Sequence, residues 1–187
     1  ASLNRVVQGV DINTGRLLIA SVLAASLGIA NCKFLNESIE RLSCEDETFD
    51  AVFCYGVFMF SNMPKTLSEI KRVLKPGGRV YVNANGIGWY AHALVEKGLK
   101  TGNAPLVLST AIMFANAMLG RSSNRVVSYA WLRKTVQAAG FELIAMGPEG
   151  SICVEPGRAV RPEPAYVESL YRMPAVIEVL AEKRRKS

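Results

Sequence analysis

A chain of 187 residues, half of them hydrophobic, is long enough for a single α/β domain with a sizeable core. Its formal net charge of +6 allows nucleic acid or an anionic surface as a partner. Part of this charge lies between Lys183 and Lys186, where no aromatic residues alternate with the basic ones. A solvated helix end is therefore the simpler interpretation, and nucleic-acid binding is disfavoured.

Cysteine and histidine usage argues against a metal site and for a reducing compartment. The four cysteines show no CxxC spacing, and His92, the only histidine, has no partner motif. Most of the cysteines fall in or near predicted strands, so we expect buried free thiols and a cytoplasmic protein. The cysteines are Cys32, Cys44, Cys54 and Cys153. No basic-then-apolar segment opens the chain, so we expect no signal peptide.

The N-terminal part of the chain is predicted to alternate strand, helix and strand. The first strand ends in an acid, Asp11, and either Asn13 or Thr14 can cap the helix that follows. This helix is apolar nearly all round, and Gly28 ends it as a C-cap. The predicted elements are a strand at residues 5–12, a helix at residues 15–27 and a strand at residues 32–35.

The stretch at residues 49–85 organises the chain. A short apolar run at residues 49–54 predicts a strand that is buried on both faces. Ser61 or Asn62 can cap the next helix, in which Pro64 lies near the first turn. Its apolar stripe consists of Leu67, Ile70, Val73 and Leu74. The helix ends at Pro76-Gly77-Gly78, and a strand at residues 79–83 follows, so this βαβ unit predicts a parallel sheet with a right-handed crossover.

The same stretch resembles the class I S-adenosylmethionine-dependent methyltransferases. The resemblance rests on Phe49-Asp50-Ala51-Val52 and on the run LSEIKRVLKPGG at residues 67–78. It covers about residues 5–154. It implies a Rossmann-like, doubly wound and mostly parallel sheet with an antiparallel last strand, and S-adenosyl-L-methionine as the cofactor.

The resemblance also implies several cofactor-binding residues. Asp11, followed by Ile12, matches the acid that holds the cofactor ribose, and an acid at a strand tip suits a ribose on physical grounds as well. The alternative for Asp11 is a turn residue that caps the helix. The position near the adenine falls on Ser38, where the family more commonly has an acid, so Ser38 and Ile39 are expected neighbours of the adenine.

Residues after the strand at 49–54 should also line the cofactor. Ligands of open parallel sheets lie beyond the carboxyl ends of the strands, which places Tyr55, Gly56 and Val57 there. The run Cys54-Tyr55-Gly56-Val57 differs from the Asn/Asp-Pro-Pro-Tyr run that is typical of amine-directed nucleic-acid methyltransferases. This difference argues against methylation of nucleic-acid bases.

One part of the family pattern is missing. The family's central first strand and its Gly-rich loop should precede Asp11 by roughly 20 residues, whereas ten residues precede it here. Without that strand its two neighbours lose a partner, and unpaired buried backbone groups are costly. We therefore expect an N-terminally truncated domain, a strand borrowed from elsewhere, or direct pairing of the two flanking strands.

Residues 86–127 are predicted to be a helical lid inserted into the domain. Twenty residues between Lys100 and Arg121 carry no charge, but they hold too many polar residues for a membrane span. Their apolar character fits a hydrophobic acceptor, and core packing explains it equally well. His92, near a strand end, is a candidate general base, although a packed or surface histidine is the simpler interpretation.

The C-terminal part is predicted to close the sheet. The predicted elements are a helix at residues 129–139 capped by Ser128, strands at residues 141–146 and 151–154 as the closing hairpin, and short helices at residues 166–171 and 174–186. All of these elements are expected to belong to one domain spanning residues 1–187.

The leading hypothesis is methyl transfer to a small organic acceptor, with the acceptor atom and the oligomeric state left open. The alternative is a non-catalytic module that binds a partner and no cofactor, which the missing loop favours. A nicotinamide-dependent oxidoreductase would need a Gly-x-Gly-x-x-Gly turn that this chain lacks. An RNA-binding enzyme would show a steep salt dependence of its RNA affinity.

Overall fold

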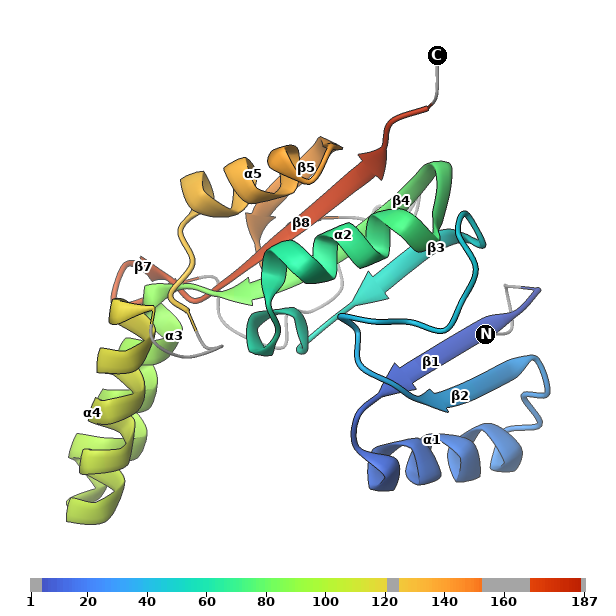
Figure 1. Cartoon of the computed structure of the whole chain (residues 1–187). Coiled ribbons are helices and arrows are strands. Elements are labelled where there is room, and N and C mark those ends of the chain that lie inside the picture. Colours follow the sequence, from blue (N-terminus) through green and yellow to red (C-terminus); the bar gives the residue numbers. More distant parts are fainter. Residues whose placement is uncertain (1–4, 121–124, 153–168, 186–187) are drawn as a thin grey trace. The chain divides into compact units, whose positions relative to one another are not determined.

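The computed structural model describes residues 5–120, 125–152 and 169–185 (Figure 1). The chain divides into two compact units, Ala1–Glu45 and Asp46–Ser187, and each is described by itself. Whether both belong to one domain, as the sequence predicts, stays a prediction.

The first unit consists of β1 (Val7–Asp11), α1 (Thr14–Ser26) and β2 (Cys32–Asn36). The two strands pair in parallel, from Val7 opposite Cys32 to Asp11 opposite Asn36. Asn13 caps the helix, since its side chain accepts a hydrogen bond from the Arg16 N–H at 3.1 Å. The predicted strand, helix and strand are therefore confirmed.

Helix α1 buries little of its apolar surface. None of its residues is fully buried, and the half-buried ones, Leu17, Ala20 and Ala24, are spaced to lie along one side. Its exposed apolar residues include Leu18, Ile19, Val22 and Leu23. The helix therefore presents a broad apolar surface on its other sides.

The second unit contains the predicted βαβ motif: β3 (Phe49–Cys54), the short helix η1 (Phe58–Phe60), α2 (Met63–Val73) and β4 (Leu74–Asn85). Strands β3 and β4 are parallel. Asn62 caps α2 by accepting from the Lys65 N–H at 3.2 Å. The predicted stripe of Leu67, Ile70, Val73 and Leu74 is completely buried. The sequence pattern thus predicted the βαβ motif correctly.

Two details of this motif differ from the prediction. Strand β4 already starts at Leu74, which pairs with Phe49 of β3. The next pair is Ala51 and Arg79, so the register shifts between the two pairs. The residues expected to form a turn, Pro76-Gly77-Gly78, lie in this irregular part of the strand. Strand β3 is an edge strand and is not buried on both faces. Phe53 on this edge strand is largely exposed, although its ring stacks on that of Tyr81 in β4.

The larger sheet has the order β3-β4-β8-β5, in which β8 (Val176–Lys183) is antiparallel to β4 and to β5 (Phe141–Pro148). The predicted antiparallel last strand is thus present. The helix predicted at residues 174–186 is wrong, because Val176–Lys183 form a central strand, and residue 186 lies outside the described part. Its apolar residues are spaced closely enough to mimic a helical face, while three of them are β-branched, namely Val176, Ile177 and Val179.

Two other C-terminal predictions are also corrected. Residues 169–174 form the small hairpin of β6 (Ser169–Leu170) and β7 (Met173–Pro174), with Tyr171 and Arg172 at positive φ in its turn. This replaces the helix predicted at residues 166–171, of which residues 166–168 lie outside the described part. Residues 151–152 are not in a strand, and the rest of the predicted 151–154 strand is outside the described residues.

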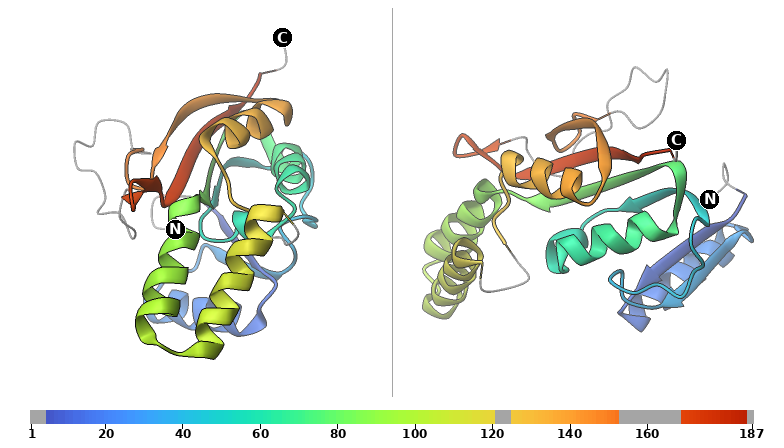
Figure 2. Two further views of the ribbon diagram at one scale, coloured as in Figure 1. Left: turned by 90° about the vertical axis from the view of Figure 1, so that its left-hand side faces the viewer. Right: turned by 45° about the horizontal axis from the view of Figure 1, so that its top comes forward.

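Helices cover one face of the larger sheet and also form a hairpin beyond its end. Figures 1 and 2 show α2 and α5 (Tyr129–Ala138) on the same side of the sheet. The segment predicted as a lid folds as two helical arms that lie side by side. One arm runs through α3 (Ile87–His92) and η2 (Ala93–Gly98), then η3 (Leu99–Thr101), and the other is α4 (Ala104–Leu119).

The strand that the sequence lacks has no replacement among the described residues. Strands β1 and β2 form a separate two-stranded sheet, and β3 lies at the edge of the four-stranded one. The strands at residues 5–12 and 49–54 lie in different units, so their direct pairing, which was one of the three expectations, stays a prediction.

Candidate functional site

Asp11 lies at the carboxyl end of β1, where the sequence predicts a ribose-binding acid. Its Oδ1 accepts from the Asn13 N–H at 2.8 Å, and its Oδ2 is 3.6 Å from the Arg16 guanidinium. The side chain is 21% exposed, and Ile12 beside it is largely exposed. Each carboxylate oxygen has two lone pairs, so the group retains acceptor capacity for a diol. The local geometry fits the predicted role, although the capping contact also fits the simpler one.

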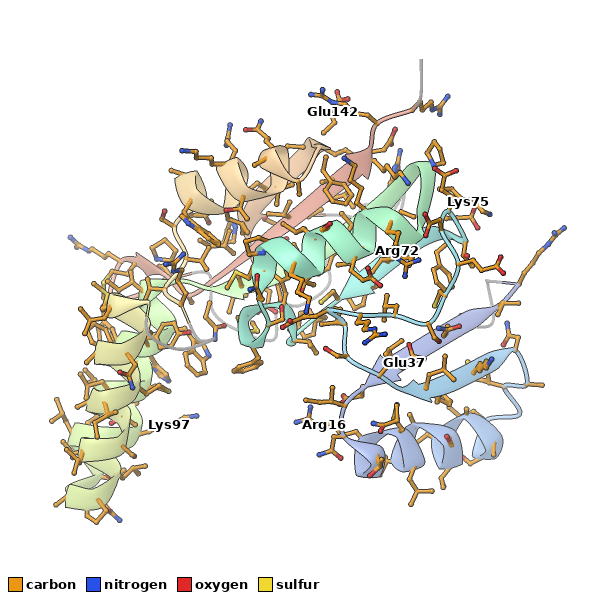
Figure 3. All side chains as sticks on the ribbon, in the orientation of Figure 1. Arg16, Glu37, Arg72, Lys75, Lys97 and Glu142 are labelled. Atoms are coloured by element: carbon orange, nitrogen blue, oxygen red, sulfur yellow. The ribbon has the colours of Figure 1, made fainter. Side chains whose placement is uncertain are left out.

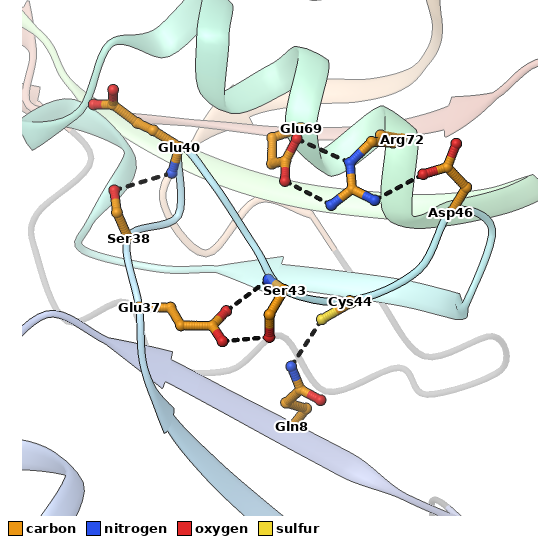
Figure 4. Close-up of polar contacts among 9 residues, drawn as sticks. All are labelled: Gln8, Glu37, Ser38, Glu40, Ser43, Cys44, Asp46, Glu69 and Arg72. Carbon is orange, nitrogen blue, oxygen red and sulfur yellow. Dashed lines mark hydrogen bonds and ion pairs between the residues drawn. The ribbon is translucent and has the colours of Figure 1, made fainter.

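The loop after β2 is held by an acid that the sequence analysis did not single out. The Glu37 carboxylate accepts from the Ser43 N–H at 2.9 Å and from the Ser43 hydroxyl, and these hydrogen bonds lower the pKa of Glu37 (Figure 4). Inside the loop, Ser38 Oγ accepts from the Glu40 N–H at 3.2 Å. Ser38 is exposed and Ile39 is half-buried. The predicted adenine neighbours therefore lie on a loop that its own side chains close.

Tyr55, Gly56 and Val57 follow directly on the end of β3, as predicted. Gly56 has φ +70°, and its N–H donates to Asn83 Oδ1 at 2.8 Å. The Tyr55 hydroxyl donates to Glu149, while the whole residue remains 39% exposed. Two side chains from elsewhere in this unit thus fix the predicted loop. Asn83 was missed, although a polar residue inside an apolar strand is a usable signal.

A second tyrosine–glutamate pair lies on the sheet face opposite α2. Glu178 on β8 accepts from the Tyr81 hydroxyl at 2.6 Å, from the Ile152 N–H at 2.6 Å and from the Ser151 hydroxyl at 3.3 Å. The pKa of Tyr81 is raised mainly by burial of its hydroxyl and secondly by the neighbouring Glu178 carboxylate. The Tyr81 ring stacks on Phe53 with centroids 4.9 Å apart. A glutamate inside a buried strand is therefore fully provided with donors, as a buried carboxylate requires.

The charged residues of the resemblance motif act structurally. Arg72 makes two contacts with Glu69, at 2.6 and 3.0 Å, and one with Asp46 at 2.7 Å (Figure 4). Lys75, labelled in Figure 3, pairs with Asp50 at 2.8 Å. These contacts connect α2 and its C-terminal end to β3 and to the segment that precedes it. They are partly solvent-exposed, so each contributes modestly to stability.

His92 is the last residue of α3 and is half-buried. Beside it, the buried ring of Tyr90 packs edge-on against Trp89 with centroids 5.1 Å apart. Within the described part of the chain, no hydrogen bond joins His92 to another predicted site residue. Its role as a general base stays a prediction.

The part of the chain that contains these strand ends is similar to known proteins. Residues 1–82 match the model of the family described as "Methyltransferase domain". The match runs from the first unit through β3 and α2 into β4, which is the stretch that carries the resemblance. This match covers somewhat less than half of the chain, so residues 1–82 are similar to the methyltransferase domain family.

Two curated relatives that match the chain are methyltransferases as well. The chain is 36% identical over 76 residues to a sterol 4-C-methyltransferase of Caenorhabditis elegans, covering 40% of this chain and 23% of that protein. It is 42% identical over 71 residues to a ubiquinone/menaquinone biosynthesis C-methyltransferase of Brucella anthropi, covering 37% and 27%. These matches thus span about a quarter of each relative.

The fold is also similar to that of solved methyltransferases. The structure of a SAM-dependent methyltransferase from Methanosarcina mazei aligns with a TM-score of 0.61 and 17% identity, covering 96% of this chain and 82% of that one. At this identity the likeness concerns the fold alone. The sequence-based prediction of a Rossmann-like class I methyltransferase fold is confirmed.

Proposed function

We propose that the chain binds S-adenosyl-L-methionine and takes part in methyl transfer to a small organic acceptor. The observation that carries the proposal is the family match over residues 1–82. The strand ends within this match carry residues suited to a nucleoside-like ligand. When bound, the cofactor supplies an electrophilic methyl group on a sulfonium.

Each predicted group has a distinct binding role in this proposal. The carboxylate of Asp11 accepts from the two ribose hydroxyls, for which its free lone pairs suffice. Ser38 and Ile39 lie against the adenine, the first as a polar group and the second as apolar surface. Tyr55, Gly56 and Val57 line the methyl-transfer end, held by the hydrogen bond from Gly56 to Asn83 and by the one from Tyr55 to Glu149.

The chemistry asks for orientation more than for a dedicated base. Methyl transfer from a sulfonium proceeds by in-line attack, so aligning the acceptor atom supplies much of the rate. The fixed loop after β3 suits this task, because Asn83 in β4 holds its backbone at Gly56 and Glu149 after β5 holds the Tyr55 side chain. His92 remains the candidate base for acceptors that must lose a proton.

The acceptor is proposed to be hydrophobic. The names of two relatives point to a sterol and to ubiquinone or menaquinone biosynthesis for those proteins. In this chain, α4 carries no charged residue, and the segment at residues 86–127 is proposed to act as a lid over the acceptor.

The first test is calorimetric titration of S-adenosylhomocysteine into the chain and into Asp11→Ala. We expect micromolar binding that weakens at least about tenfold in Asp11→Ala, since two hydrogen bonds to a charged group are lost. Asp50→Ala is the matched control, because Asp50 is another strand aspartate that pairs with a cation. An unchanged affinity in Asp11→Ala would refute the ribose role.

The second candidate is a partner-binding module that holds no cofactor. It is favoured by the absence, within the described residues, of a Gly-rich turn between a strand and a helix. A folded chain that shows no heat of binding and no thermal shift with S-adenosylhomocysteine would support this candidate, because a ligand specific to the folded state must stabilise it.

A further inference from the structure

One side of α4 is apolar and exposed. Leu108, Ile112 and Leu119 are 63%, 51% and 62% exposed, and with the exposed Ala115 their spacing places them on one side of the helix. The opposite side includes Thr110 and Ala117, which are buried. Contiguous exposed apolar surface of this kind marks an interaction site more often than chance exposure.

The charges that flank α4 most closely in the sequence all have the same sign. From Lys97 to Phe141 the sequence contains six basic residues and no acidic one: Lys97, Lys100, Arg121, Arg125, Arg133 and Lys134. Lys97 and Lys100 are exposed where the first helical arm ends, and Figure 3 shows Lys97 extending from it. At the other end of α4, the Arg125 guanidinium lies close to Gly120. The uncharged helix is thus bracketed by cations.

The nearest acid neutralises only part of this charge. Glu96 pairs with Lys100 at 2.8 Å and accepts from the Tyr171 hydroxyl at 2.8 Å. Lys97 is exposed as well, so the end of the first helical arm keeps a positive excess, with Lys97 and Lys100 against Glu96. Positive charge beside an apolar helix suits an anionic lipid surface, which attracts nearby Lys and Arg side chains.

We propose that the exposed side of α4 docks on the surface of an anionic phospholipid bilayer, with the helix lying in the interface. No helix in the described parts is long and apolar enough to cross a bilayer. A 16-residue uncharged helix with flanking cations fits an interfacial position. Such docking would bring a lipid-like acceptor to the proposed lid, but it requires neither cofactor nor acceptor.

The test is flotation of the chain with vesicles of phosphatidylcholine, with or without about one third phosphatidylglycerol. We expect binding to the anionic vesicles that weakens with salt, and at most weak binding to the neutral ones. Leu108→Ser/Ile112→Ser should lower the partition at least about tenfold, since two inserted side chains become polar. Lys97→Gln/Lys100→Gln should weaken binding to the anionic vesicles only.

The matched control is Leu18→Ser/Val22→Ser on α1. These residues have the same i, i+4 spacing and similar exposures of 66% and 59%, and they should leave the partition within about twofold of the original. Far-ultraviolet circular dichroism would verify that both double variants fold. The proposal would be overturned if the folded chain did not bind vesicles, or if both double variants lost vesicle binding equally. It would also be overturned if the chain formed a dimer in solution and only the α4 double variant were monomeric, since a second copy would then cover this side of α4. Failure of cofactor binding would leave this result untouched.

Discussion

Replacing Tyr81 by phenylalanine tests whether the buried tyrosine–glutamate pair holds the larger sheet together. The substitution removes one hydroxyl and keeps the ring that stacks on Phe53. Glu178 is then left with the donors from Ile152 and Ser151. Both partners of the lost bond are buried, at 8% and 2% exposure, so water replaces it poorly.

The expected loss follows from the charge on the acceptor. A hydrogen bond to a charged group contributes about 1.5–3 kcal/mol, and leaving a buried group without its partner has a similar cost. We therefore expect Tyr81→Phe to lower the free energy of unfolding by about 1.5–3 kcal/mol, a large part of the 5–15 kcal/mol typical of a domain. Because the folded state raises the pKa of Tyr81, this contribution is complete below the unfolded tyrosine pKa of about 10 and declines at higher pH.

Urea unfolding of the original chain and of Tyr81→Phe at neutral pH measures the loss directly. Tyr171→Phe is the control, since that hydroxyl also donates to a glutamate, Glu96, but at the surface. It should change stability by less than about 0.5 kcal/mol. If Tyr81→Phe cost no more than Tyr171→Phe, the buried pair would not contribute as argued, and the reasoning from burial would be refuted.

Two further predictions concern the other face of the sheet and the thiols. Ile70→Ala should lower the free energy of unfolding by about 2–5 kcal/mol in urea melts, and Ile70→Val by about 0.5–1.5 kcal/mol, because the Ile70 side chain on the inner side of α2 is completely buried; equal losses would contradict a cavity origin. Burial raises the pKa of Cys54 to about 12, so iodoacetamide at pH 8 should modify the half-buried Cys32 and Cys44 well before Cys54, with peptide mass spectrometry as the readout. Equally fast labelling of Cys54 in the folded chain would contradict its burial.

The βαβ unit was predictable because its local signals agree with one another. The cap at Asn62, the buried stripe of α2 and the glycines after it each indicate the same helix and the same return of the chain. The exposure of Phe53 was not predictable in this way. Whether a strand face is covered depends on helices from elsewhere in the chain, and a short apolar run carries no information about them.

Strand β8 was mistaken for a helix for a related reason. A central strand covered by neighbours on both sides needs no alternation of apolar and polar residues, so Val176, Ile177 and Leu180 satisfy a helical spacing equally well. The β-branched residues and the absence of a capping residue were the signals against a helix. Glu178 lies inside this strand, and its partners in β4 and after β5 are visible only in three dimensions.

Some residues of the candidate site could be predicted from the sequence, and others could not. The residues that follow a strand end, such as Asp11 and Tyr55, can be placed from the pattern alone, because strand ends are where open parallel sheets bind ligands. The residues that fix them cannot, since they come from distant segments. Asn83 is 27 residues from Gly56, and Glu149 is 94 residues from Tyr55.

This arrangement links the proposed chemistry to the two faces of the larger sheet. The face under α2 is apolar, with Val80 and Val82 completely or nearly completely buried, and it accounts for the stability of the sheet. The opposite face carries Tyr81, Asn83 and Glu178, whose burial would be unfavourable without partners. Asn83 is satisfied in part by the loop after β3, so the polar residue that the sheet must pair is also the one that orders this loop. Orientation of an acceptor therefore begins in the sheet itself, before any ligand is bound.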